Sequence, residues 1–73
     1  MKTYLIVWFS SEGDVPSEVI SRLTSLGFNP ITGNYDFEYT WRKKPSLEQL
    51  FSFIDQIQKT LEGSKAYFKV ETV

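Results

Sequence analysis

The sequence predicts an α+β fold with the element order strand, helix, strand, strand, helix, strand. Apolar residues recur at helical spacing in two segments, residues 16–26 and 46–62. Four other segments are rich in β-branched and aromatic residues, namely residues 3–9, 28–32, 35–42 and 65–73. Glycine or proline stands at every junction between these segments, which indicates turns there.

The first predicted strand is apolar on both of its alternating sides. The two sets are Tyr4, Ile6 and Trp8 on one side and Leu5, Val7 and Phe9 on the other. Strands with two apolar sides are typical of the centre of a sheet. Whichever side the helices leave uncovered, three large apolar residues remain on it.

The first helix is predicted over residues 16–26. Its apolar residues are Val19, Ile20, Leu23 and Leu26. We expect Asp14 to cap its start, Pro16 to occupy its first turn, and Gly27 to adopt the left-handed conformation past its end.

A hairpin is predicted to join the second and third strands. Residues 28–32 contain Pro30, which lacks a donor and therefore favours a sheet edge. Gly33 and Asn34 are typical of a two-residue turn. In the strand that follows, aromatic and polar residues alternate, and we expect the aromatic set to pack under the helices. That set is Tyr35, Phe37, Tyr39 and Trp41.

The second helix begins with Ser46 and Gln49 at capping-box spacing. Its predicted apolar stripe is Leu47, Leu50, Phe51, Ile54, Ile57 and Leu61, with Phe53 at the edge. Gly63 is expected to end it. The last strand places Ala66, Phe68 and Val70 on one side and Tyr67, Lys69 and Glu71 on the other.

This element order is typical of the ferredoxin-like βαββαβ architecture, expected here as a single domain over residues 1–73. Right-handed crossovers place both helices on one face of a four-stranded antiparallel sheet. The first strand is expected to be central and the Pro30 strand to lie at an edge.

The other face of such a sheet has no covering layer. Burying one large apolar side chain contributes about 1.5–3 kcal/mol, so a bare apolar centre favours an interface. We therefore expect a homo-oligomer formed by sheet-to-sheet or edge-to-edge contact. The alternative is a monomer in which Tyr67 and the long rim side chains shade the apolar centre.

Composition excludes several function classes. The 73 residues include no Cys and no His, so disulfides, thiolate zinc sites and His- or Cys-based catalysis are absent. The net charge of −1 argues against nucleic-acid binding. No segment is apolar over the length of a membrane span or shaped like a signal peptide. We expect a soluble, cytoplasmic protein without a cofactor or an enzymatic activity.

Two local patterns have the residue types of functional sites, but we expect both to be structural. Glu12 and Asp14 are close carboxylates that could serve acid–base or metal chemistry, but a solvated loop and a helix cap explain them better. The aromatic set of the third strand could stack RNA bases. The acids that alternate with it would repel phosphate, and we expect the same aromatic rings to be needed in the core.

The segment Thr32-Gly33-Asn34-Tyr35-Asp36 resembles the hairpin of the ligand-binding domain of the leucine-responsive, or feast/famine, regulators. That domain is an ACT-like module also called RAM, and its order of elements matches nearly the whole chain. The resemblance implies a module that dimerises through its sheet and binds an amino acid or similar effector between protomers. It implies ligand contact for Thr32, Gly33, Asn34, Tyr35 and Asp36. No helix-turn-helix pattern accompanies it, so DNA binding is not implied.

Three functions remain open at this level. The first is a non-catalytic small-effector-binding or regulatory dimerisation module. The second is a structural or interaction module that docks a partner chain on its open sheet face. The third is a small metal-dependent ribonuclease similar to the CRISPR-associated ferredoxin-like enzymes. That family has an aspartate at the end of the first strand, where this chain has Phe9-Ser10-Ser11.

Overall fold

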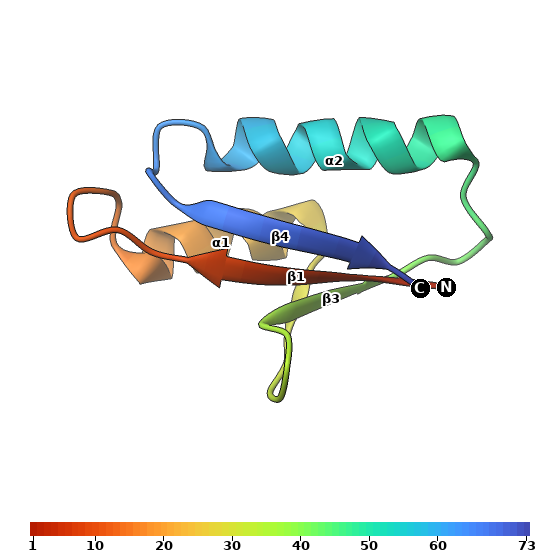
Figure 1. Cartoon of the computed structure of the whole chain (residues 1–73), viewed down its shortest axis with the longest axis horizontal. Coiled ribbons are helices and arrows are strands. Elements are labelled where there is room, and N and C mark those ends of the chain that lie inside the picture. The colour runs from red at the N-terminus through yellow and green to blue at the C-terminus, as the bar shows by residue number, and fades with distance from the viewer.

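A computed structural model describes all 73 residues and shows an α+β fold (Figure 1). The elements in chain order are β1 (Lys2–Trp8), α1 (Pro16–Leu26), β2 (Asn29–Pro30), β3 (Phe37–Thr40), α2 (Leu47–Leu61) and β4 (Tyr67–Thr72). The first helix therefore has its predicted bounds. Neither helix is long and apolar enough to cross a membrane.

The four strands form one antiparallel sheet in the order β2-β3-β1-β4. As predicted, β1 is central, because it pairs with β3 on one side and with β4 on the other. Also as predicted, the Pro30 strand is an edge that pairs with β3 alone. The two chain ends lie together because the Lys2 N–H donates to the Val73 carbonyl at 3.0 Å (Figure 1). The arrangement is compatible with a ferredoxin-like fold.

Both helices pack against the same face of the sheet. The buried core consists of Leu5, Val7, Val19, Leu23, Phe28, Phe37, Phe53, Ile57 and Leu61. Leu5 and Val7 are two residues apart on β1 and so share one face. They contact the helices in a single cluster, which leaves the side of Tyr4, Ile6 and Trp8 uncovered.

An aromatic cluster fills the core between β3 and α2. The ring centroids of Tyr39 and Phe53 lie 4.5 Å apart, and those of Trp41 and Phe53 lie 5.2 Å apart. Phe28 stacks on Phe53 at 5.4 Å and meets Phe37 edge-on at 6.4 Å. The prediction that Phe37, Tyr39 and Trp41 pack under the helices is confirmed.

This cluster also sets the rotation of α2 and corrects its predicted stripe. Phe53 is only 7% exposed and lies inside the core, whereas Leu47 and Phe51 are 66% and 59% exposed. The helix turns Phe53 toward Phe28, Tyr39 and Trp41, and aromatic pairs of this kind contribute free energy beyond that of the area they bury. Phe51 is displaced to the solvent as a result.

The helix ends follow prediction except at the start of α1. Gly27 has φ 115° and donates its N–H to the carbonyls of the last turn, as expected. Ser46 and Gln49 form both hydrogen bonds of a capping box. The predicted Asp14 cap is wrong, because Val15 occupies the cap position and no side chain caps the helix.

The first strand has its predicted length but begins and ends one residue earlier, and the other three strands are shorter than predicted. Only Asn29–Pro30 pairs out of residues 28–32, because Pro30 cannot donate to a ladder and the chain then turns away. The third strand begins at Phe37 and the last at Tyr67. Lys65, with φ 58°, holds the turn before β4 in a left-handed conformation.

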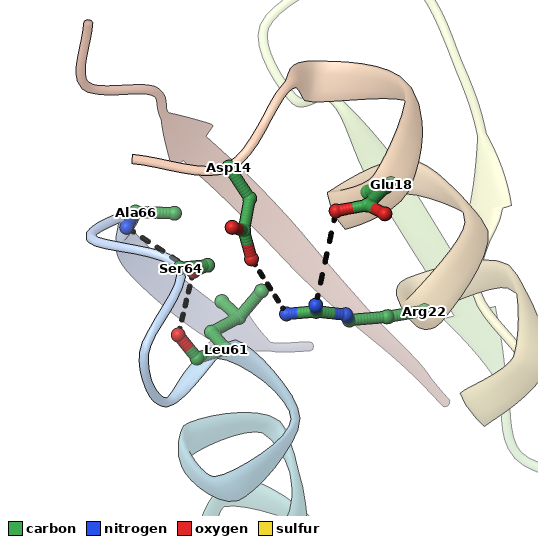
Figure 2. Close-up of polar contacts among 6 residues, drawn as sticks. All are labelled: Asp14, Glu18, Arg22, Leu61, Ser64 and Ala66. Atoms are coloured by element: carbon green, nitrogen blue, oxygen red, sulfur yellow. Dashed lines mark hydrogen bonds and ion pairs between the residues drawn. The ribbon is translucent and has the colours of Figure 1, made fainter. Parts of the chain in front are cut away.

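A polar joint connects the loop before α1 to the loop before β4 (Figure 2). The Asp14 carboxylate forms an ion pair with Arg22 at 3.1 Å, and the Asp14 N–H donates to the Ser64 carbonyl at 3.1 Å. Buried Ser64 donates its hydroxyl to the Leu61 carbonyl at 2.6 Å and accepts from the Ala66 N–H at 3.2 Å. Asp14 therefore ties two loops together instead of capping a helix.

Candidate functional site

The sheet face opposite the helices is the first candidate site, and we call it the open face. Its side chains follow from the strand register, since residues two apart share a face and paired residues point the same way. It comprises Lys2, Tyr4, Ile6 and Trp8 from β1, Tyr67, Lys69 and Glu71 from β4, Glu38 and Thr40 from β3, and Asn29 from β2.

Large apolar side chains follow β1 along the open face, and those at the end of the strand are the most exposed. Trp8 pairs with Tyr67 across β1 and β4, and the two residues are 52% and 72% exposed. Ile6 and Tyr4 continue the row along β1 and are half-buried. In the monomer alternative, Tyr67 and the long rim side chains shade the apolar residues of this face. Trp8 nevertheless keeps about half of its surface in the solvent.

Tyr35 lies on the open face, which corrects its predicted place under the helices. Its ring stacks on Tyr4 with centroids 4.7 Å apart, and its hydroxyl donates to the Glu71 carboxylate. The alternation fails because Tyr35 precedes β3, where no strand pairing holds it to the pleat. Hydrogen bonding to Glu71, with a smaller effect from desolvation, raises the pKa of the Tyr35 phenol.

Charges of both signs surround the apolar row on the open face. Lys2 forms an ion pair with Glu38 at 3.3 Å, and Glu71 is engaged by Tyr35. Lys69, next to Ile6 on β4, has no carboxylate partner within its own chain. The face therefore has one positive charge that remains unpaired in the single chain.

The hairpin that carries the predicted ligand residues is wider than a two-residue turn. The Ile31 N–H donates to the Asp36 carbonyl at 2.9 Å, so residues 32–35 form a four-residue loop. Gly33 has φ 108°, a conformation that favours glycine. Thr32, Gly33 and Asn34 are exposed at the tip of this loop.

Asp36 bonds to the backbone of β1 beyond the end of the β3 pairing. Its N–H donates to the Leu5 carbonyl and its Oδ2 accepts from the Val7 N–H, both at 2.9 Å. Oδ1 accepts no hydrogen bond within the chain, and no cation pairs with the carboxylate. One carboxylate oxygen therefore remains available.

Asp36 also lines a pocket at the end of β1. The pocket has a volume of about 240 Å³, and its other lining residues are Val7, Phe9, Ile20, Pro30 and Phe37. A single carboxylate in an apolar wall suits a small ligand with a cationic group and an apolar body. Sequence reasoning missed the apolar lining residues because they come from five separate elements or loops.

The five residues singled out from the sequence do not converge on one point. Tyr35 lies on the open face, Asp36 lines the pocket, and the other three form the loop tip between them. The fold thus brings the hairpin motif beside two different surfaces. Comparison with known proteins finds no family model, curated protein or solved structure that matches this chain significantly.

Proposed function

We propose that this chain is a non-catalytic regulatory module of the ferredoxin-like, ACT-like (RAM) type that dimerises through its open face. The observation that supports the proposal best is the exposed pair of Trp8 and Tyr67 on the uncovered face of the sheet, at the end of the central strand β1. Large exposed aromatic residues on one face are typical of binding surfaces. An amino acid or a similar small effector is proposed to bind beside the Thr32–Asp36 hairpin.

The charges of the open face suit a two-fold pairing with a second copy. Because β3 and β4 flank β1 on opposite sides, a two-fold axis parallel to β1 lays β4 of one copy over β3 of the other. The unpaired Lys69 then faces the side of the sheet that carries the acidic Glu38. The aromatic rows meet at the centre, where water would be excluded.

The effector proposal is supported by the chemistry of the Asp36 pocket. The free Oδ1 suits an ammonium group, and Val7, Phe9 and Ile20 suit an apolar side chain. The 240 Å³ volume lies below the usual range of about 300–1,000 Å³ for ligand pockets, so only a small ligand fits. An apolar amino acid has both groups.

Dimerisation is tested by Trp8→Glu with Phe51→Glu as its matched control. Both side chains are exposed aromatics, but Phe51 lies on α2, away from the open face. We expect Trp8→Glu to weaken self-association at least thirtyfold, because removing an aromatic residue that is buried in an interface costs about 2 kcal/mol or more. Phe51→Glu should change the strength of self-association less than twofold. Sedimentation equilibrium from 10 µM to 1 mM measures both.

The proposal is wrong if the unmodified chain stays monomeric at 1 mM, or if the two variants behave alike. Melting temperatures of both variants establish that each remains folded. A chain that is monomeric alone but binds a different protein through Trp8 would favour the structural interaction module instead.

Effector binding is tested by thermal denaturation with each standard amino acid and its N-acetyl derivative, which lacks the ammonium charge. A ligand at ten times its Kd stabilises by about 1.4 kcal/mol, which raises the melting temperature of so small a domain by several degrees. We expect this rise in melting temperature with an apolar amino acid, and no rise with its N-acetyl derivative. Asp36→Asn should abolish the shift while still accepting the Val7 N–H.

The melting temperature of Asp36→Asn without ligand should stay close to that of the unmodified chain, since the hydrogen bond persists. Effector binding is refuted if no amino acid shifts the unmodified chain. It is refuted equally if Asp36→Asn responds as strongly as the unmodified chain does.

A further inference from the structure

A groove between the end of β3 and α2 lies apart from the Asp36 pocket and touches the open face only at Thr40. It consists of two adjacent hollows of about 270 and 540 Å³ that share Tyr39, Trp41 and Gln49 in their walls. The groove runs between the end of β3 and the first half of α2. Its volumes approach or fall within the range of about 300–1,000 Å³ usual for small-ligand pockets.

The polar groups of the groove are cations, amides and hydroxyls, and no carboxylate lines it. Arg42 and Lys43 stand at its mouth, and neither forms an ion pair within the chain. Gln49 uses its Oε1 to accept the Ser46 N–H at 2.8 Å, which leaves its NH2 group as a donor. In a chain of net charge −1, a groove with only positive charge stands out as suited to an anion.

The floor of the groove is aromatic and rigid. Tyr39 and Trp41 are half-buried and meet edge-on with centroids 5.0 Å apart. Both rings also contact buried Phe53, and the Trp41 Nε1–H donates to Thr3 Oγ1 at 2.8 Å, which fixes the indole. Rings held in this way present preformed surfaces on which a planar group can stack.

We propose that this groove binds a small anion that carries a planar aromatic ring. The ring would lie against Tyr39 and Trp41, and the anionic group would meet Arg42 and Lys43. A nucleoside monophosphate and an aromatic carboxylate share this chemistry. The site shares no lining residue with the Asp36 pocket, and it meets the open face only at Thr40.

Trp41 can report binding directly once the other tryptophan is removed. The background variant is Trp8→Phe, which leaves Trp41 as the sole tryptophan. The probes are AMP, with a ring and a phosphate, adenosine, with the ring alone, inorganic phosphate, and 4-hydroxybenzoate. Fluorescence titration and calorimetry give the Kd for each probe.

We expect AMP or 4-hydroxybenzoate to bind at least tenfold more tightly than adenosine or phosphate, and to change Trp41 fluorescence. Removing both mouth cations with Arg42→Ala and Lys43→Ala should weaken binding at least tenfold. The control is Lys44→Ala, which removes an adjacent charge that does not line the groove, and it should change the Kd less than threefold.

A response to AMP alone assigns the site to phosphate-bearing ligands, and a response to 4-hydroxybenzoate alone assigns it to carboxylates. The proposal is overturned if neither probe binds, or if phosphate alone binds as tightly as AMP. It is also overturned if Lys44→Ala weakens binding as much as the double variant, because the attraction would then be non-specific.

Discussion

Tyr35 changes the surface that the open face presents to a partner, because it covers part of Tyr4 and engages Glu71. Its ring covers one side of Tyr4, and its hydroxyl engages Glu71, the residue that pairs with Tyr4 across the sheet. The neighbouring Asp36 holds the backbone of β1 through the Val7 N–H. Two adjacent residues therefore fasten the hairpin to the central strand from different sides.

The raised pKa of Tyr35 predicts how its contribution varies with pH. An unfolded tyrosine ionises near the ordinary pKa of 10.0, and the folded chain retains the proton to higher pH. The stabilisation is therefore complete below pH 10 and declines as pH rises above it, because the unfolded state then binds fewer protons.

The variant Tyr35→Phe keeps the ring stack and removes the hydroxyl. We expect it to be less stable than the unmodified chain at pH 7, with a difference that shrinks between pH 10 and pH 11. Urea denaturation at pH 7, 9, 10 and 11 measures this difference. A difference independent of pH would show that the bond to Glu71 has no such role.

At the scale of elements, the polar joint holds the uncapped start of α1 in place. No side chain caps this helix, but Arg22 reaches from it to Asp14 in the preceding loop, and also lies 4.0 Å from Glu18. The Asp14 N–H in turn donates to the carbonyl of Ser64. Ser64 lies in the turn that follows α2 (Figure 2). The joint thus links α1 to the turn between α2 and β4.

Gly13 allows the two loops of the joint to approach closely. A Cβ atom at this position would lie 2.0 Å from the Ser64 carbonyl oxygen, a backbone atom that cannot move aside without shifting its loop. We expect Gly13→Ala to destabilise the fold by about 1–3 kcal/mol, as overpacked sites do. Urea denaturation measures the free energy of unfolding.

The control for Gly13→Ala is Ser11→Ala, an exposed position in the same loop. Such a surface change is expected to stay within about 0.5 kcal/mol of the unmodified chain. If the two variants lost equal stability, the contact between these loops would be too weak to hold the joint.

At the scale of the whole molecule, the chain is one layer of helices on one layer of sheet, with extents of 37 × 25 × 18 Å. Only 12 of 73 residues are buried, since a two-layer domain of this size covers one side of its sheet. The apolar side chains of a central strand therefore cannot all be buried within one copy. That geometry is the physical basis of the expected dimer, and Trp8→Glu tests it.

Several features of the fold could be predicted from local pattern alone. The period of the apolar residues predicted both helices, Ser46 and Gln49 predicted the start of α2, and Gly27 predicted the end of α1. Pro30 predicted an edge strand, and the two apolar sides of residues 3–9 predicted a central one. Each of these depends on neighbours within about four residues or on a single backbone property.

The candidate sites were less predictable because they join residues distant in sequence. The hairpin motif located Asp36, but not the pocket walls from β1, α1 and β2 that surround it. The groove beside Trp41 had no sequence signal, since Arg42 and Lys43 resemble an ordinary solvated turn until Gln49 and the aromatic floor are placed beside them.

The amino-acid sequence by itself determined the kind and order of the elements, because hydrophobic periodicity, caps and turn residues act over short distances. Only the tertiary structure decided that Phe53 turns inward, that Tyr35 turns outward onto Tyr4, and that Asp14 pairs with Arg22. Those outcomes depend on which surfaces meet across the sheet. Competition among such long-range contacts overrides local preference whenever a different pairing buries more apolar area or satisfies a charge.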